Sequence, residues 1–217
     1  MAITLTNLGA IASYQENLER AEQYWLEGLS LARRANVRLS ILTLLANIGL
    51  LQADRGKYDE ADRSFEEAVA LTSEIHSPRM EAAVRSLFGD VLRKQKRFDA
   101  ALQQLSISKR LAHETGDLER YGNTLRYLGE LYTSIEQFEE AETALTEALK
   151  TARELEHEIL VGDVLFSQAK LMFARGDQAE SMQIAGNALE IHERLGDAQR
   201  VGILQKWMKN PNEPADL

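Results

Sequence analysis

The feature that most constrains the fold of this chain is an internal repeat with a period of forty residues. Sliding the sequence against itself by this period aligns small residues at the ninth position, namely Gly9, Gly49, Gly89, Gly129 and Ala169. A second column of small residues follows at Ala21, Ala61, Ala101, Ala141 and Ser181. A period of about 20 to 50 residues is typical of stacked repeat architectures.

Large apolar residues alternate with these small ones. One column contains Leu8, Ile48, Phe88 and Leu128, and another contains Trp25, Phe65, Leu105, Leu145 and Ala185. We expect the small residues to let two helices approach closely while the large ones fill the remaining volume at the density of a protein interior.

Short polar turns interrupt the apolar pattern inside and between the repeats. Examples are Arg55-Gly56-Lys57 and Arg175-Gly176-Asp177 within units, and Gly116-Asp117 and Gly196-Asp197 between units. Pro78 lies at an expected helix start, where its missing N–H is tolerated. Each unit therefore reads as helix, tight turn, helix, which we call its first and second helix.

Together these columns resemble the tetratricopeptide repeat family. Asn7-Leu8-Gly9 and Tyr58-Asp59-Glu60-Ala61 are similar to the family's pattern, and the resemblance covers residues 1 to about 197 in five units. The usual period is about 34 residues, so the longer period here is similar to the long-repeat branch, and the family's proline after the second helix is mostly absent. The resemblance implies an all-α fold, a right-handed α-α superhelix (solenoid) of five helical hairpins.

We predict a single solenoid over residues 1–210, with units 1–37, 38–77, 78–117, 118–157 and 158–197. The fifth unit departs most from the pattern, as expected of a terminal repeat with a polar outer face. Residues 198–210 form a capping helix that carries Val201, Leu204, Trp207 and Met208. Residues 211–217 are expected to be a mobile tail. No cap precedes residue 1, which fits either an excised module or a short native start.

Composition limits the possible functions. The formal net charge of −9 disfavours general binding to nucleic acid or to an anionic membrane, since both need a large basic surface. The chain has no cysteine, which removes disulfides and thiolate chemistry. No secretory signal or membrane-spanning run is visible, so we expect a cytoplasmic protein.

In the resembled family, ligands lie along the face formed by the first helices. Carrying that face onto this chain gives the candidate binding residues Asn7, Asn47, Asp90, Arg93, Arg126, Tyr127, Glu130, Phe166, Lys170 and Phe173. Asn7 and Asn47 match positions where family members bind the backbone of an extended peptide, and an amide offers both donor and acceptor.

Two alternatives stay open for the other candidates. Arg93, Arg126 and Lys170 could bind a ligand carboxylate or phosphate, or they could pair with Asp90 and Glu130 between adjacent helices. Phe166 and Phe173 lie seven residues apart on one helical face. They could form an exposed apolar anchor, or they could pack under the capping helix.

Catalytic and metal signals are weak. The four histidines are His76, His113, His157 and His192, and none lies three or four residues from another. Each is near an expected helix end, where it could interact with the helix dipole or face water. No nucleophile–base pair can be proposed, so we expect no enzyme activity, no cofactor and no metal.

The leading hypothesis is a scaffold that binds a peptide or protein in the concave groove. The alternative is a ligand- or peptide-sensing module of a larger bacterial regulatory protein, and self-association through an exposed edge hairpin is a third possibility. The family's clamp for a chaperone C-terminus needs polar or basic residues where this chain has Thr6, Ala10, Ala46 and Leu50. The third unit is locally basic, which could steer an acidic partner or simply be a solvated face.

Overall fold

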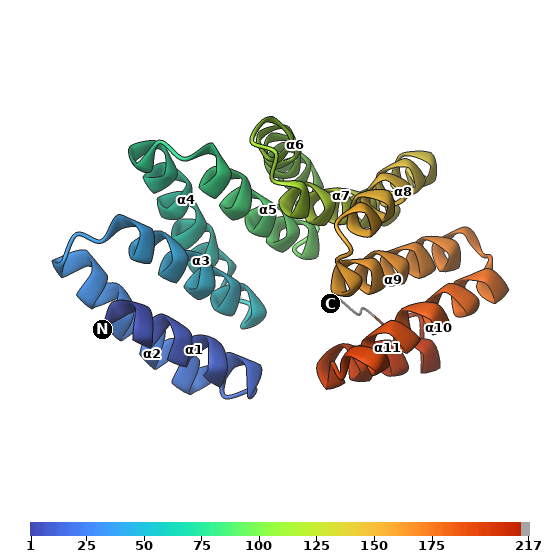
Figure 1. The fold of residues 1–217 in the computed structure, drawn as a ribbon, viewed down its shortest axis with the longest axis horizontal. Coiled ribbons are helices and arrows are strands. Elements are labelled where there is room, and N and C mark those ends of the chain that lie inside the picture. The colour runs from blue at the N-terminus through green and yellow to red at the C-terminus, as the bar shows by residue number, and fades with distance from the viewer. Residues whose placement is uncertain (214–217) are drawn as a thin grey trace. The chain divides into compact units, whose positions relative to one another are not determined.

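The computed structural model describes residues 1–213, and within this range the regular secondary structure is entirely helical. The helices are α1 (Ala2–Tyr14), α2 (Leu18–Arg34), α3 (Arg38–Asp54), α4 (Tyr58–Ile75), α5 (Pro78–Lys94), α6 (Phe98–Glu114), α7 (Leu118–Ser134), α8 (Phe138–Glu154), α9 (Glu158–Arg175), α10 (Gln178–Leu195) and α11 (Ala198–Lys209). Their order in the chain can be followed in Figure 1. The expected all-α fold of helical hairpins is confirmed.

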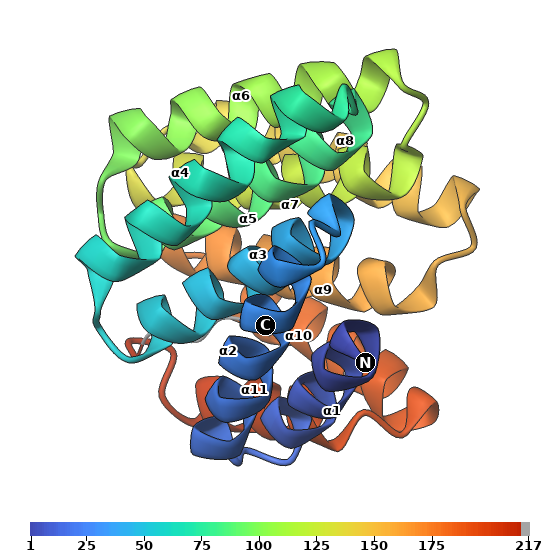
Figure 2. The ribbon, with the colours of Figure 1, turned by 90° about the vertical axis from the view of Figure 1, so that its left-hand side faces the viewer.

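The chain divides into two compact units, Met1–Arg97 and Phe98–Leu217. The first unit contains α1 to α5, and each helix packs on the next, while the first helices α1, α3 and α5 also contact their neighbours. The second unit contains α6 to α11 with the same sequential packing, and α7 contacts α9. Figure 2 shows the same helices from a second direction. The division falls in the turn between α5 and α6, so the single solenoid over 1–210 stays a prediction.

Every turn between helices contains one residue with a positive φ angle, and these residues recur at intervals of twenty. They are Glu16, Asn36, Gly56, His76, Lys96, Gly116, Glu136, Glu156, Gly176 and Gly196. Glycine adopts this left-handed conformation without steric cost, whereas other L residues are strained by about 1–2 kcal/mol. The four glycines were visible as turn signals in the sequence. The polar segments around Glu16 and Lys96 also indicated turns, but nothing in the sequence indicated a positive φ at the six other residues.

Helix starts have local causes. The side chains of Asn17, Asp117 and Asp197 each accept a hydrogen bond from the backbone N–H three residues on. Ser77 does the same for Met80 directly before Pro78, which begins α5 as expected. Such caps satisfy N–H groups that have no partner inside the helix.

The small residue at the ninth position makes room for the large residue sixteen positions later. A Cβ added to Gly9 would overlap the Trp25 ring, one on Gly129 would overlap Leu145, and one on Gly49 would lie 2.9 Å from Phe65. The first and second helices of these hairpins are therefore held close by glycine on one side and a large apolar side chain on the other.

The fifth hairpin replaces both members of this pair. Ala169 takes the place of glycine and Ala185 takes the place of the large residue, and both are fully buried in one core cluster. Ser181 Oγ also donates to the carbonyl oxygen of Ala169, at 2.8 Å. The departure of this unit from the pattern is thus a change of core packing as well as a feature of a terminal repeat.

The expected capping helix is confirmed as α11. Leu204 and Trp207 are buried, and the Trp207 ring meets Phe166 and Phe173 edge-on, at centroid distances of 5.2 and 5.9 Å. After Lys209 the chain turns, with Glu213 N donating to the carbonyl oxygen of Asn210. The last four residues of the predicted mobile tail, 214–217, lie outside the described residues.

Candidate functional site

The ten candidate binding residues all lie on first helices, and they fall into two groups. Asn7 on α1, Asn47 on α3, and Asp90 and Arg93 on α5 belong to the first compact unit. The remaining six lie on α7 and α9 in the second unit and are Arg126, Tyr127, Glu130, Phe166, Lys170 and Phe173. The two groups therefore belong to separate units of the chain.

Asn7 and Asn47 occupy equivalent positions on α1 and α3, which contact one another. Asn7 is exposed and Asn47 is half-buried. Within residues 1–213, neither side-chain amide takes part in a hydrogen bond. The hydroxyls beside them are already used, because Thr6 Oγ1 donates to the Ala2 carbonyl at 3.0 Å and Thr43 Oγ1 donates to the Leu39 carbonyl at 3.1 Å. The two amides thus have their full hydrogen-bonding capacity available to a ligand.

Asp90 and Arg93 form a buried ion pair on α5. The guanidinium Nη2 lies 2.8 Å from Asp90 Oδ1, and Nε lies 3.0 Å from the same oxygen. Lys94 Nζ lies 3.1 Å from the other carboxylate oxygen. Pairing with Asp90 is therefore the alternative that the structure has, although it occurs three residues apart on one helix instead of between helices.

In the second unit, Glu130 is the centre of a buried polar cluster between α7 and α9. Its Oε1 accepts from Arg126 Nη1 at 3.0 Å, from Lys170 Nζ at 3.0 Å and from Ser167 Oγ at 2.6 Å. The Arg126 guanidinium also lies over the Tyr127 ring, 4.3 Å from its centroid. A carboxylate with two cationic partners and a hydroxyl donor tolerates burial, because its charge is compensated and hydrogen-bonded.

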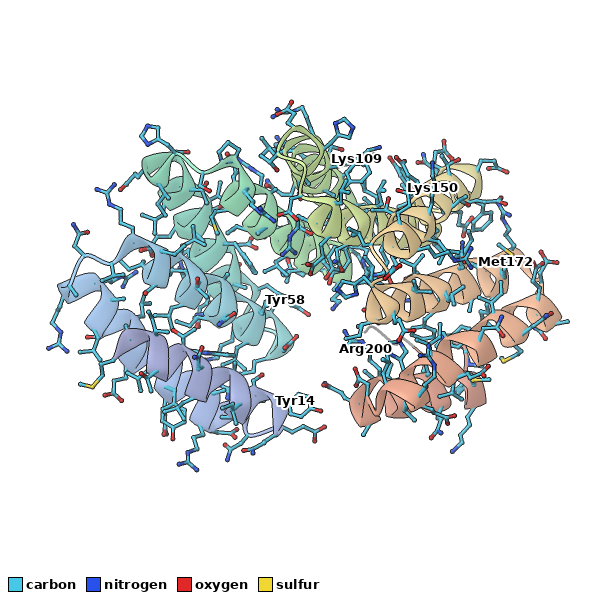
Figure 3. All side chains as sticks on the ribbon, in the orientation of Figure 1. Tyr14, Tyr58, Lys109, Lys150, Met172 and Arg200 are labelled. Atoms are coloured by element: carbon cyan, nitrogen blue, oxygen red, sulfur yellow. The ribbon has the colours of Figure 1, made fainter. Side chains whose placement is uncertain are left out.

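Asp163 connects the same face to the C-terminal helix. Arg200 on α11 donates from Nε and Nη2 to the two Asp163 oxygens, at 2.8 and 3.2 Å. Figure 3 labels Arg200 beside α9, where this bidentate pair forms. Asp197 at the start of α11 pairs with the same guanidinium at 2.8 Å. Sequence reasoning did not identify the pair of Asp163 and Arg200, because nothing in the sequence shows which charges meet across 37 residues.

Of the two alternatives for the histidines, a position in water does not hold for His192, which lies in the last turn of α10. Its side chain is fully buried on α10, and Nε2 lies 3.3 Å from Asp163 Oδ1. The backbone of Gly162 lies against this ring, since an added Cβ there would be 2.5 Å from Nε2. His192 occupies a space that is left by a glycine on the facing helix. Because the ring has no exposed surface, a substrate cannot reach it.

The electrostatics of Asp163 follow from these contacts. Burial alone would raise the pKa of Asp163, but the contacts from His192 and Arg200 and the charge of Arg126 outweigh burial and lower the pKa below its usual value. The carboxylate is therefore held in its charged form. Its role is to fix α10 and α11 against α9.

Phe166 and Phe173 pack under the capping helix, which is the second of the two arrangements expected for them. Phe166 is fully buried and Phe173 is half-buried, and both pack under Trp207 of the capping helix. Lys170 Nζ lies 5.0 Å from the centroid of the Phe166 ring. Phe166 therefore presents no surface on which a ligand could anchor.

The two groups of candidate residues thus differ in what they offer. The charged candidates are paired within their own unit, and all of them except the half-buried Lys170 are buried. The aromatic pair packs in the core. Among the candidates Asn7 is exposed, and Asn47, Tyr127 and Lys170 are half-buried. This arrangement can donate to and accept from the main chain of a ligand, and no proton-transfer chemistry follows from it.

No helix within residues 1–213 has both the length and the apolar character needed to cross a membrane.

Comparison with known proteins finds related sequences and related structures. The sequence is 28% identical over 199 residues to Protein KINESIN LIGHT CHAIN-RELATED 3 of Arabidopsis thaliana, covering 87% of this chain and 30% of that protein. It is 23% identical over 207 residues to human Protein O-mannosyl-transferase TMTC1, covering 95% of this chain and 20% of that protein. The chain thus spans less than a third of the length of either relative.

Solved structures share the fold. BtubC (BKLC) from P. vanneervenii superposes with a TM-score of 0.70 at 15% identity, covering 88% of this chain and 80% of that one. A Rap protein complexed with competence and sporulation factor superposes with a TM-score of 0.72 at 13% identity, covering 96% and 63%. The sequence also matches the tetratricopeptide repeat over residues 1–74 and 80–154. With its helical hairpins and forty-residue register, the chain belongs to the tetratricopeptide repeat family.

Proposed function

We propose that the chain is a non-catalytic scaffold that binds an extended segment of a protein partner, and that Asn7 and Asn47 hold the main chain of this segment. Tetratricopeptide repeats generally mediate protein–protein interactions, which supports the class of function. The observation that carries the residue assignment is the pair of accessible amides without partners at equivalent positions of adjacent first helices.

The surroundings of the two amides favour main-chain recognition over recognition of a charged side chain. Thr43 is exposed and Leu50 is half-buried on α3, while Ile3 and Ala10 are exposed on α1. All four are uncharged. A peptide lying across α1 and α3 would meet an amide on each helix, and an amide can accept from a peptide N–H while donating to a peptide carbonyl.

The first-helix face of the second unit is less suited to this role. Arg126 and Glu130 are each more than nine-tenths buried and paired with each other. A ligand anion would have to displace a buried carboxylate from Arg126, which leaves a charge without its partner and costs several kcal/mol. The proposal therefore places the peptide contact on the first unit.

Selection of binders from a random peptide library by the full chain, followed by calorimetric titration of an enriched peptide, tests this function. Each net hydrogen bond contributes about 0.5–1.5 kcal/mol, so losing one at each residue in Asn7→Ala with Asn47→Ala should weaken binding by about 5- to 150-fold. Asn187→Ala removes an exposed amide from the second helix α10 and should leave the affinity unchanged. Equal affinity of the double variant and the unmodified chain would disprove the assignment.

A sensing module of a larger regulatory protein is the second candidate. It is supported by the structural likeness to a Rap protein in complex with competence and sporulation factor and by the small share of the plant and human relatives that the chain spans. A sensing module that binds a small molecule differs from the scaffold in its ligand. A failed peptide selection, together with a small molecule that raises the melting temperature, would favour that module over the scaffold.

A further inference from the structure

Helix α1 exposes a continuous apolar surface. Residues 1–15 contain no charged side chain, and five large side chains of this segment are exposed, namely Met1, Ile3, Leu8, Ile11 and Tyr14. Tyr14 is labelled at the end of α1 in Figure 3. Exposed apolar surface that is contiguous and free of charge is typical of an interaction site.

The forty-residue register allows the exposure of residues on α1 to be compared with that of equivalent residues in the later repeats. Ile11 is 55% exposed, but the equivalent residues are 0% to 4% exposed, namely Leu51, Val91, Leu131 and Leu171. Leu8 is 38% exposed, whereas its equivalents are 4% to 6% exposed, namely Ile48, Phe88 and Leu128. In the later repeats these positions are thus covered, and on α1 they are open.

The cover in the later repeats is the second helix of the preceding hairpin. Phe88, equivalent to Leu8, stacks on Phe65 of α4 with ring centroids 5.0 Å apart. In the fourth repeat, Thr124 is equivalent to Thr4, and its Oγ1 lies 3.0 Å from Ser108 Oγ of the preceding second helix α6. We call the surface formed by Met1, Thr4, Leu8 and Ile11 the α1 edge. It has the chemistry of the interface between hairpins, but its four residues are exposed.

We propose that a second copy of this chain covers the α1 edge, so that two chains pair through α1 about a two-fold axis. The argument is self-complementarity, since an isologous contact places the same surface on both partners. The side chains of these fifteen residues carry no charge, so the surface can meet itself without burying like-charged side chains. In an antiparallel pair the two α-amino groups of Met1 lie at opposite ends of the contact. Residues 8 and 11 lie one helical turn apart, so an antiparallel pair sets Leu8 of each chain against Ile11 of the other.

A head-to-tail arrangement is disfavoured by the chemistry of the last helix. The outward positions of α11 include Gln205, Lys206 and Lys209, all exposed. Placing them against the α1 edge would bury ammonium groups in an apolar contact, which is costly. Pairing through α1 therefore gives a closed dimer instead of a growing filament.

Asn7 borders the α1 edge, because it lies one helical turn from Thr4 and from Ile11. A second chain on the α1 edge therefore lies beside the proposed peptide contact. The two proposals are tested separately, since the mass of the chain is measured without any peptide.

Light scattering of the full chain, with any purification tag at the C-terminus, tests the proposal by mass. We expect a concentration-dependent rise from 24.4 kDa towards twice that value. Ile11→Glu should remain monomeric, because it places a carboxylate in the contact. Leu26→Glu, at a side chain of α2 that is 50% exposed, is the matched control and should still dimerise. A monomer up to several hundred micromolar, or equal dissociation by both variants, overturns the proposal.

A second measurement does not depend on the folding of a charge-bearing variant. Because the chain has no cysteine, Ile11→Cys provides a single thiol, and a short bismaleimide should link two chains through it. Leu26→Cys should give no linked dimer under the same conditions. Failure of Ile11→Cys to cross-link at concentrations where the chain is dimeric would overturn the α1–α1 contact.

Discussion

At the scale of single residues, the core of each hairpin depends on matched volumes. Gly9, Gly49 and Gly129 on first helices each face a large side chain on the second helix, and the fifth hairpin changes both positions to alanine. The columns in the sequence were sufficient to predict close helix approach. They did not show that the smaller side chain of Ala185 makes room for the methyl group of Ala169, because each column, taken alone, shows only one residue that departs from its pattern.

This pairing gives a prediction for Gly129. Gly129→Ala would push a methyl group into Leu145 and should destabilise the chain by about 1–3 kcal/mol from overpacking. The better helix propensity of alanine offsets up to about 1 kcal/mol of this. Denaturant unfolding of the variant measures the difference.

Two further variants make the test specific. Gly186→Ala adds a methyl group where nothing lies within 4 Å and should stabilise by up to about 1 kcal/mol. In Leu145→Ala the large side chain is removed, so Gly129→Ala should cost less than it does in the unmodified chain. Additive free energies in this double-mutant cycle would mean that the two positions are not coupled.

At the scale of helices, α11 is fixed by one apolar and one charged contact. Trp207 packs on Phe166 and Phe173, and Arg200 pairs with Asp163. The apolar pattern of residues 198–209 predicted the helix and its capping role. The charged contact could not be predicted, because it depends on how α9, α10 and α11 are brought together by packing.

The lowered pKa of Asp163 predicts how this contact responds to acid. A carboxyl whose pKa is lower in the folded state contributes stability above its unfolded value, which is about 3.9, and loses this contribution as the pH falls through the folded value. We therefore expect the docking of α11 to be constant from pH 8 to about 5 and to weaken below about pH 4.

Trp207 can report this transition. The chain has two tryptophans, so Trp25→Phe leaves Trp207 as the only fluorescent indole, and exposure to water should shift its emission to longer wavelength. In Asp163→Asn the low-pH component of the shift should be lost. An identical pH profile with and without the Asp163 carboxyl would show that other carboxylates control the docking of α11.

At the scale of the whole molecule, the forty-residue repeat predicts the fold better than any local motif does. Five units in register were sufficient to predict an all-α fold of hairpins and to indicate the family. The same register placed the candidate binding residues on the first helices, where they are found. Sequence alone did not indicate which of them stay accessible, because Arg126 and Glu130 are removed from the surface by their own pairing. It also did not indicate the two compact units.

What the chain can bind thus depends on what the burial of the charges leaves exposed. On the first unit this is an uncharged face with two free amides, and at its edge an uncharged helix that we assign to self-association. Equivalent positions of the repeats support both inferences. The two amides recur at equivalent positions of α1 and α3, whereas Leu8 and Ile11 are exposed on α1 and have buried apolar equivalents in later repeats.

The central claim is that Asn7 and Asn47 bind the main chain of a peptide, and an NMR titration of the ¹⁵N-labelled chain with a library-selected peptide tests it most directly. The side-chain NH₂ resonances of Asn7 and Asn47 should shift on saturation, because their amides form new hydrogen bonds. Those of Asn123, whose Nδ2 already donates to the Glu119 carbonyl, and of Asn187 should stay in place. Saturation that leaves the Asn7 and Asn47 resonances unchanged while others move would contradict the account.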